Sequence, residues 1–368
     1  MKSYEKTIVE AIKSSVKNHE WCCSGRYNKR NLLYKVKYIS WYILLIFLSP
    51  YKTVTSSKFV CAFTPVNEKR LIKYCDDNEY YTFAKLNASI RQLVRNRSVL
   101  SPYSRLKRIY ISFNGLVFFL IHRKELHGYL HFTLEYYAIA YYIRDKLPKE
   151  IIMPGMYDRY CTLLSYLGHG LGICLIGVQD GAAVDIQVPV KVYCDKMYAF
   201  DEFEGEIIKS FIKNSDCRFV WSGFSSMINW SIYPKRDKKI IAIASQDWFT
   251  NKTLELIEVI MSRINTDRYE VIVYPHYRED AKQYNEVCKK YPSIILESQL
   301  RYSNIDLLIT FYSTIVYDFW SVNKNLNVLC LRLKGYEPGY YMRPNVYVAE
   351  SYKELIEYLK MPKIWKRE

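Results

Sequence analysis

The 368-residue chain lacks the cysteine patterns that hold small domains together. Its ten cysteines are scattered, none forms a C-x-x-C pair, and no spacing is typical of a zinc site. A disulfide framework and the zinc-finger classes are therefore excluded. No cleavable signal sequence is evident, so we expect a reducing cytoplasm, in which the thiols pack as small apolar groups.

The sequence also lacks an apolar run long enough to cross a membrane. The most apolar segment spans residues 38–52, and its uninterrupted run, Trp41 to Leu48, is far shorter than the ~20 residues that a span needs. Lysines flank this segment, and Tyr38 and Trp41 are typical of a membrane interface. Two interpretations stay open: the segment lies in a headgroup layer, or it forms a buried core helix.

Acidic residues are scarce in the first third of the chain. Residues 1–124 contain 23 Lys and Arg against 7 Asp and Glu, so the net charge of +16 resides there and the remainder is balanced. Such asymmetry indicates an anionic partner, either nucleic acid or an anionic membrane surface, unless it serves only solubility. No RNP, KH, zinc or helix-turn-helix signature is present, so we expect the membrane surface and no nucleic acid.

Two common ligand motifs are absent as well. The stretch LGHGLG, Leu167 to Gly172, precedes a strand-like run instead of following one, so it predicts a turn and not a dinucleotide loop. His169 within it is a candidate for contact with an acceptor substrate. No Asp-x-Asp motif occurs, and Asp76-Asp77 lies in a polar stretch typical of a solvated turn. We therefore expect no metal ion.

Apolar runs of strand length alternate with helical stretches over most of the chain. The strand-like runs are 58–63, 108–114, 150–155, 172–179, 196–200 and 217–223, then 239–245, 269–276, 293–298, 305–310 and 326–333. This alternation predicts an α/β protein with two Rossmann-like, doubly wound domains, a cleft between them and a basic helical N-terminal extension.

The domain boundaries follow from the polar stretch Ser231–Lys239, which predicts a linker. We expect a basic, partly apolar helical segment at 1–55, an acceptor domain at 56–232, a nucleotide-donor domain at 236–340, and a tail at 341–368 that packs back on the acceptor domain.

Three groups of polar residues follow strand-like runs, where parallel sheets bind ligands. They are Gln179-Asp180-Gly181, then His276, then Ser313-Thr314 between a strand and a helix. Hydroxyls and N–H groups at a helix start form an anion site, to which His276 can donate. Singly, each has an ordinary interpretation as a turn aspartate, a surface histidine or a helix cap. Together they favour a small-molecule site, to which we add three candidate nucleotide- or phosphate-binding residues: Ser245, Gln246 and Tyr312.

The order and spacing of these groups between Gly172 and Leu333 resemble two families. NIDLLITFYSTIVYDF resembles the strand–Ser/Thr–helix stretch of CDP-glycerol glycerophosphotransferases, and YPHYRED resembles their histidine motif and the His-Pro motif of bacterial sialyltransferases and polysialyltransferases. VQDGAAVD resembles the acidic-Asp-Gly motif of the sialyltransferases. The chain departs from these motifs at Gln179, where they have an acidic residue, and at Tyr277, where they have proline.

The resemblance implies a metal-independent glycosyltransferase of GT-B architecture in the synthesis of bacterial surface polysaccharide, either capsule or lipopolysaccharide. The donor would be a nucleotide sugar of the CMP-linked sialic acid or Kdo type. Asp180 would be the general base, His276 would stabilise the departing nucleotide, and Ser313 and Thr314 would hold its phosphate. Three residues would lie at the cleft near a glycan or lipid-linked glycan acceptor: Gln179, Gly181 and His169.

The basic first third would keep such an enzyme on the inner face of the cytoplasmic membrane. Three alternatives stay open. A transferase using CDP-glycerol or CDP-ribitol would have histidine where Asp180 stands. A nucleotide-sugar 2-epimerase needs several acid/base groups around one sugar. A non-catalytic nucleic-acid-binding protein fits the charge but has no motif.

Overall fold

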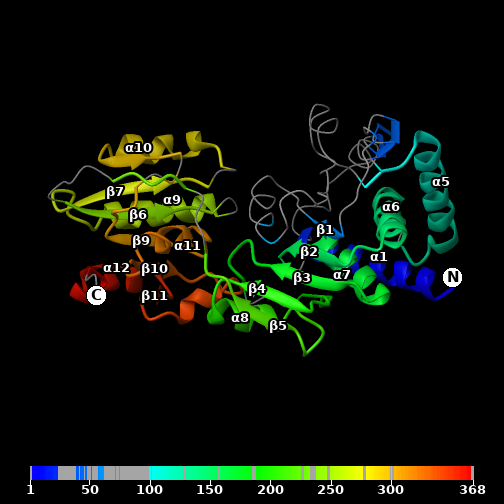
Figure 1. Ribbon diagram of the computed structural model, residues 1–368. Helices are drawn as coiled ribbons and strands as arrows, with labels where there is room; N and C mark the ends of the chain where they lie inside the picture. Colours follow the sequence, from blue (N-terminus) through cyan, green and yellow to red (C-terminus); the bar gives the residue numbers. More distant parts are fainter. Residues whose placement is uncertain are drawn as a thin grey trace. The chain divides into compact units, whose positions relative to one another are not determined.

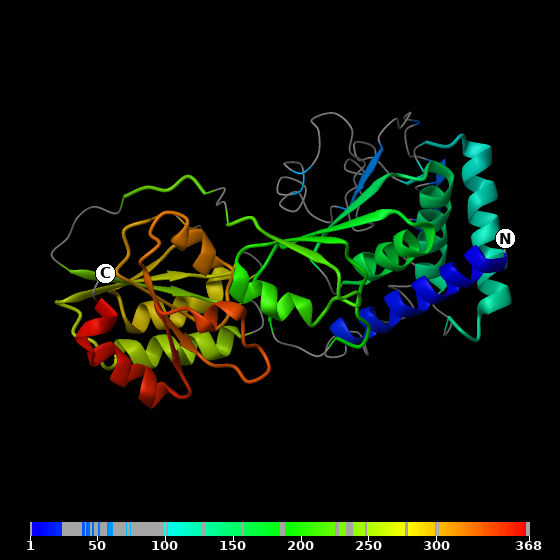
Figure 2. The same ribbon diagram turned by 60° about the horizontal axis from the view of Figure 1, so that its bottom comes forward.

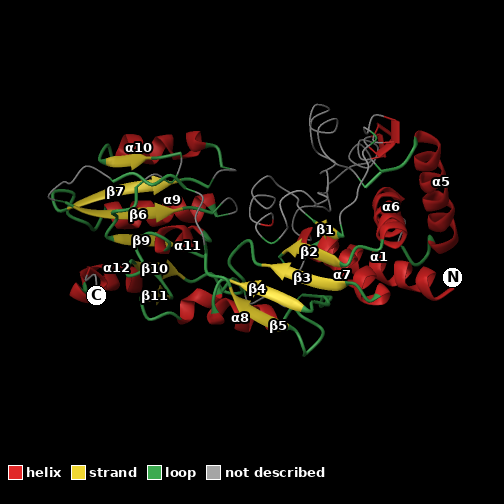
Figure 3. Ribbon diagram, in the orientation of Figure 1, coloured by secondary structure: helices red, strands yellow, loops and turns green. Residues whose placement is uncertain are grey.

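Figure 1 shows the computed structural model and Figure 3 its helices and strands. It describes residues 2–23, 39–40, 42–44, 46–47, 51, 57–61, 71, 74, 99–100, 102–126, 130–155, 158–184, 188–224, 228–232, 238–246, 249–276, 279–298, 300 and 302–365. These form two compact units. The first comprises Met1–Asp180, Gln187–Ala199 and Ile208–Trp221, and the second comprises Gly181–Ile186, Phe200–Ile207 and Ser222–Glu368.

The first unit is built on a five-stranded parallel sheet of order β1-β2-β3-β4-β5. Its strands are β1 (Lys58–Val60), β2 (Glu150–Pro154), β3 (Cys174–Val178), β4 (Lys196–Ala199) and β5 (Arg218–Trp221). Ile152 pairs with Ile176 in the β2–β3 register. Alternate residues of β2 enter two different cores, Ile151 one and Ile152 the other, because both faces of the sheet are covered.

Four long helices lie in the described residues of this unit: α1 (Lys2–Cys23), α5 (Arg105–His122), α6 (Leu130–Lys146) and α7 (Arg159–Leu171). α1 packs along α7, where buried Asn18 donates to Thr162 Oγ1 over 2.8 Å. Figures 1 and 2 both show α5 beside α6. The side chain of Asp158 caps the start of α7, and Gly172, which has a left-handed φ of 67°, caps its end.

One strand prediction in this half was wrong. Residues 108–114, expected as a strand, lie inside α5. Ser104 caps this helix by accepting from Lys107 N, and Ile111, Gly115 and Phe118 recur at helical spacing on the buried face. The short stretch RIYISFN has the β-branched and aromatic residues of a strand, but its continuation into GLVFF keeps the period of a helix.

The second unit contains a six-stranded parallel sheet of order β11-β10-β9-β6-β7-β8. Its strands are β6 (Lys239–Ala244), β7 (Tyr269–Tyr274), β8 (Ile294–Leu296), β9 (Leu307–Thr310), β10 (Asn327–Leu331) and β11 (Val346–Ala349). Its helices are α9 (Thr250–Met261), η2 (Ala281–Tyr284), α10 (Asn285–Lys290), α11 (Ile315–Trp320), η3 (Gly339–Met342), α12 (Tyr352–Lys360) and η4 (Pro362–Trp365). α8 (Glu202–Lys209) begins in this unit and ends in the first.

Alternation along β6 shows that the second sheet is doubly wound. Ile241 and Ile243 enter the core that includes α9 and α12, whereas Ile240 and Ala242 enter the core that includes α11. Helices therefore cover both faces, and the predicted class of two parallel-sheet α/β domains is confirmed.

The C-terminal residues do not form the tail that we expected on the acceptor domain. Val346–Ala349 is strand β11, which pairs in parallel with β10 of the second sheet. Leu355 and Leu359 of α12 are buried in the core of that same unit. This strand, which follows the aromatic loop at 337–344, was missed because it has only four residues.

Of the N-terminal segment 1–55, residues Lys2–Cys23 form helix α1, which is part of the first unit and not a separate extension, whereas residues 24–38 lie outside the described part. The apolar segment 38–52 is described only in pieces, in which Tyr42 and Ile46 are buried while Phe47 is exposed. Most of the predicted linker, residues 233–237, also lies outside the described residues.

Candidate functional site

Strands β6, β7 and β9 end at one edge of the second sheet, and the predicted phosphate-binding residues follow them there. Ser245 and Gln246 come after β6, His276 after β7, and Ser313-Thr314 after β9. β6 is the hydrogen-bonded neighbour of both other strands. These residues therefore share the carboxyl edge, at which open α/β sheets bind ligands.

Glu279 organises the loop that carries His276. Its carboxylate accepts from His276 N at 2.8 Å, from Thr250 Oγ1 at 2.5 Å, from Tyr284 OH at 3.1 Å and from Ser245 Oγ. Ser245 Oγ in turn accepts from His276 N at 2.7 Å. The Ser245 hydroxyl hydrogen is thus directed to Glu279, so this residue holds the loop in place instead of pointing a donor outward.

Sequence reasoning missed Glu279, although a Glu three residues after the histidine was visible in YPHYRED. Tyr277, where the chain departs from the family motif, lies outside the described residues.

Gln246 and Tyr312 meet at the same edge. Gln246 Nε2 donates to the Tyr312 carbonyl oxygen over 2.8 Å and so ties the end of β6 to the loop after β9. The Tyr312 ring stacks on Tyr336 with centroids 5.1 Å apart, and Phe249 meets it edge-on at 5.9 Å. Three partly buried aromatic rings thus form a platform beside the β9 loop, of the type on which a nucleobase stacks.

The Ser313-Thr314 pair is positioned by its surroundings more than by α11, which has only six residues. Ser313 N donates to Tyr340 OH over 2.8 Å, and Ser313 Oγ accepts from Ile315 N at 3.3 Å. Thr314 Oγ1 accepts from Ala182 N at 3.0 Å. This bond leaves the hydrogen of the Thr314 hydroxyl able to donate to an anion.

The Ala182 bond joins the segment directly after Asp180 to the predicted phosphate motif within the second unit. Gly181 lies there as well, because a methyl group on it would come within 3.5 Å of Thr314 Oγ1. The sequence boundary at 232 did not suggest that residues 181–182 lie beside Thr314.

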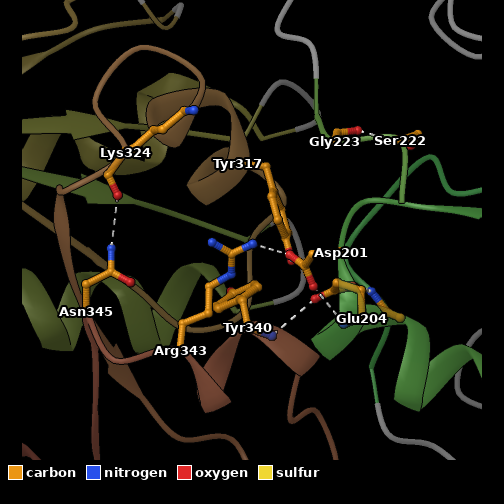
Figure 4. Close-up of polar contacts among 10 residues, drawn as sticks. Asp201, Glu204, Ser222, Gly223, Tyr317, Lys324, Tyr340, Arg343 and Asn345 are labelled. Atoms are coloured by element: carbon orange, nitrogen blue, oxygen red, sulfur yellow. Dashed lines mark hydrogen bonds and ion pairs between the residues drawn. The ribbon is translucent and has the colours of Figure 1, made fainter. Parts of the chain in front are cut away.

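Buried Glu204 holds this segment in place. Its carboxylate accepts from Ala183 N and from Tyr340 N, the latter at 3.2 Å. Tyr340 is the residue whose hydroxyl accepts from Ser313 N, so one carboxylate connects the segment after Asp180 with the phosphate motif. Figure 4 shows Glu204 and Tyr340 facing each other in this arrangement.

Asp201 supports the same network from one turn earlier. Arg343 Nη2 and Tyr317 OH both donate to its Oδ2, the latter over 3.2 Å, and Glu204 N donates to its Oδ1 over 3.0 Å (Figure 4). The Arg343 guanidinium also lies over the Trp320 ring at 4.6 Å. Burial, with Glu204 and Asp201 nearby, raises the pKa of Tyr317 far above its usual range, so it remains a donor.

In the first unit, Gln179 and Asp180 follow β3 at the carboxyl edge of the sheet. Gln179 is buried and its N–H donates to the Tyr198 carbonyl oxygen over 2.9 Å. Asp180 Oδ1 lies 3.3 Å from the place that a methyl group on Gly155 would occupy. Gly155 has a φ of 67°, so both the close approach and the backbone conformation favour glycine there.

A second carboxylate, Asp158, lies near Asp180. Its Oδ1 accepts from Tyr160 N at 2.6 Å and Cys161 N at 3.0 Å, while the Cys161 thiol donates to Oδ2 over 3.1 Å. Burial raises the pKa of Asp158 to about 6, and the charge of Asp180 adds to the increase. We did not predict this residue, although an Asp between a strand and a helix was a cap signal.

His169 does not join this edge. It lies in the last turn of α7, the end of the helix that precedes β3, and its ring stacks on Tyr193 with centroids 3.7 Å apart. α7 runs back along the sheet, so His169 is at the amino edge, opposite Asp180. The stretch LGHGLG, expected to be a turn, is helical up to Leu171.

A cavity of about 430 Å³ lies between α1, α7 and the chain before β4, also within the first unit. Four of its lining residues are lysines: Lys13, Lys17, Lys191 and Lys213. Among the described residues, no three His, Cys, Asp or Glu side chains group closely enough to hold a metal ion.

No protein-family model matches the chain, and no curated protein matches it in sequence. Solved structures do match. The glycotransferase of kitacinnamycin has a TM-score of 0.49 at 11% identity, with 84% of this chain and 92% of that one covered. The lipopolysaccharide outer core galactosyltransferase WaaB has a TM-score of 0.47 at 10% identity, with 82% of this chain and 88% of that one covered. UDP-GlcNAc 2-epimerase from Neisseria meningitidis has a TM-score of 0.43 at 12% identity, with 91% of this chain and 92% of that one covered.

The two parallel-sheet units are established by the chain's own strand pairing.

Proposed function

We propose that the protein is a glycosyltransferase that moves a sugar from a CMP-linked donor, of the sialic acid or Kdo type, to a hydroxyl of a glycan acceptor. One observation carries the proposal. The segment that follows Asp180 is hydrogen-bonded to Thr314 of the Ser313-Thr314 motif. The chain that continues the sialyltransferase-like acidic motif is therefore a neighbour of the Ser/Thr motif, which resembles that of CDP-glycerol glycerophosphotransferases.

In this proposal the donor phosphate binds the hydroxyls of Ser313 and Thr314, and His276 donates to it as the glycosidic bond breaks. Negative charge develops on the nucleotide in that step, and fixed donors stabilise it most where water is excluded. The aromatic platform of Phe249, Tyr312 and Tyr336 stacks on the base. Hydroxyls, backbone N–H groups and His276 meet the phosphate charge without a metal ion.

Asp180 accepts the proton of the acceptor hydroxyl as its oxygen attacks the anomeric carbon. A general base must reach about 3 Å from that hydroxyl. Asp158 acts as a positioning residue for Asp180. The two carboxylates repel each other when both are charged, and this repulsion is removed when one of them is protonated. The acceptor is a glycan or lipid-linked glycan of surface-polysaccharide synthesis, met at the inner face of the cytoplasmic membrane.

The first test is thermal stabilisation of the full chain by CMP, CDP, UMP, UDP and GDP. A ligand that binds only the native state adds about 2.7 kcal/mol of stability at a hundredfold excess over Kd. We expect CMP to stabilise the protein and the double variant Ser313→Ala/Thr314→Ala to lose the effect. Ser321→Ala is the matched control, because its hydroxyl caps the other end of α11.

Assays of CMP-sugar hydrolysis and of sugar transfer to an acceptor then test the role of Asp180 as the general base. Asp180→Asn should keep the CMP shift and lose transfer to acceptor, while Asp267→Asn, an exposed aspartate in the second unit, should keep both. Stabilisation by UDP or GDP alone would overturn the donor assignment. Stabilisation by CDP with turnover of CDP-glycerol would favour alditol-phosphate transfer, and no shift with any nucleotide would overturn the proposal.

A further inference from the structure

Helix α5 is apolar on two opposite sides, but the described part of the chain packs against only one of them. Ile111, Gly115 and Phe118 form the buried side, where Gly115 faces Tyr137 of α6. The other side exposes between 36 and 81% of each of eight large apolar side chains: Leu106, Ile109, Tyr110, Phe113, Leu116, Val117, Leu120 and Ile121. A helix that is apolar all round requires burial on both sides.

A neighbouring segment contacts the buried side of α5. Tyr42 OH lies 3.2 Å from Ser112 Oγ, and buried Arg108 donates to the Ile46 carbonyl oxygen over 3.3 Å. Tyr42 and Ile46 belong to the same core as Ile111 and Phe118. We call the eight exposed apolar side chains of α5 the α5 face. Contiguous apolar patches of this kind on monomers mark interaction sites.

Positive charge flanks the α5 face at both ends of the helix. Arg105 and Lys107 stand in the first turn, Arg123 and Lys124 follow the last, and no acidic residue occurs within α5. The nearest acid after it, Glu125, is paired with Lys13 at 2.7 Å. No helix in the described part of the chain is long and apolar enough to cross a membrane.

We infer that the α5 face docks on an anionic lipid surface, with α5 lying flat in the headgroup layer. Apolar side chains enter the acyl boundary, while the lysines and arginines at both ends remain among anionic headgroups. A second copy of the chain would instead bring two basic rims together, which is unfavourable. The inference deepens the membrane part of the proposed function but rests on this surface alone, not on the catalytic assignment.

The test is co-sedimentation of the full chain with vesicles of phosphatidylcholine, with and without phosphatidylglycerol, in the absence of any sugar donor. We expect binding that rises with the anionic fraction. Leu106→Ser/Phe113→Ser/Ile121→Ser should lower the partition coefficient by about 1,000-fold, at roughly tenfold per apolar side chain. The matched control is a set of exposed apolar residues of the second unit, Ile232→Ser/Val322→Ser/Met342→Ser, which should bind like the wild type.

A charge variant separates the two contributions. Arg105→Gln/Arg123→Gln/Lys124→Gln should lose about fivefold per charge on anionic vesicles and little on neutral ones. The inference is overturned if the wild type binds neither kind of vesicle, or if Leu106→Ser/Phe113→Ser/Ile121→Ser binds as tightly as the control variant of the second unit. It is also overturned if light scattering shows a wild-type dimer that the triple variant abolishes without vesicle binding. Failure of the nucleotide tests would leave vesicle binding unchanged, so the two proposals fail separately.

Discussion

Asp158 makes the stability of the first unit depend on pH in a direction opposite to that of most carboxylates. Desolvation of its partly buried carboxylate, with the charge of Asp180 nearby, raises its pKa from an ordinary value of 3.8 to about 6. Each pKa unit corresponds to about 1.36 kcal/mol, so the fold favours the protonated form by about 3 kcal/mol. We predict that Asp158→Asn removes this dependence, because asparagine is neutral and caps a helix equally well.

The sign follows from linkage. A carboxyl whose folded pKa is raised contributes its full stability below pH 4, and this contribution is lost as pH rises through 6. Wild type and Asp158→Asn should therefore be similar near pH 4, whereas the variant should be more stable by up to about 3 kcal/mol at pH 8. Asp180→Asn should shrink the difference, because the charge of Asp180 contributes to the shift.

Hydrogen exchange of the α7 backbone amides is the assay, since Asp158 caps that helix. Wild type and variant are compared at the same pH, so that intrinsic exchange rates cancel. Protection in α7 should be equal near pH 4 and about 100-fold greater in Asp158→Asn at pH 8. Asp216→Asn, an exposed aspartate of the same unit, serves as the control and should show no such change. A ratio that stays constant from pH 4 to 8, or one that turns in favour of the wild type as pH rises, would refute the reasoning.

Three further outcomes follow from packing and hydrogen bonding. Glu279→Gln should raise the donor KM about tenfold with a smaller change in kcat, because the amide offers one acceptor oxygen to four donors; steady-state kinetics would contradict this if KM were unchanged. Gly339→Ala should lower the free energy of unfolding by about 3 kcal/mol, because its methyl group would lie 2.5 Å from a backbone carbonyl oxygen. Gly335→Ala should lower it by about 1 kcal/mol, because the residue has a φ of 82°. Equal shifts in Tm for the two variants would argue against the close contact at Gly339. Phe118→Ala should lower stability by about 3–5 kcal/mol and Phe113→Ala by less than about 0.5 kcal/mol, and a reversed order in thermal melting would mean that the wrong side of α5 is buried.

Apart from β11, the strands of both sheets were predictable, because a parallel sheet covered on both faces needs continuous apolar runs. EIIMP and KIIAIA are examples, and each becomes a strand at the predicted place. The strand prediction for RIYISFN was wrong for a related reason. A largely apolar run of seven residues does not distinguish a strand from a helix that is apolar on two sides, and α5 is such a helix.

The candidate site was predictable only where its residues follow strands. His276, Ser313 and Thr314 were found because the ends of neighbouring parallel strands must lie at one edge. Glu279 was missed because three of its donors, the hydroxyls of Ser245, Thr250 and Tyr284, are brought to it only by the fold. Asp158 has the sequence signal of a helix cap, but its approach to Asp180 also depends on the fold.

The predicted domain boundary failed to show the feature that matters most for the proposed site. Asp201 and Glu204 precede the expected linker by about thirty residues, yet they are counted with the second compact unit, as is Gly181. Their partners Arg343 and Tyr340 are 142 and 136 positions away, too distant for any local pattern to reveal. These bonds fix Ala183, and through it the bond from Ala182 to Thr314. The conformation of the chain directly after Asp180 is therefore set by residues near the C-terminus, so the acidic motif and the phosphate motif depend on one buried network although the sequence separates them by more than a hundred residues.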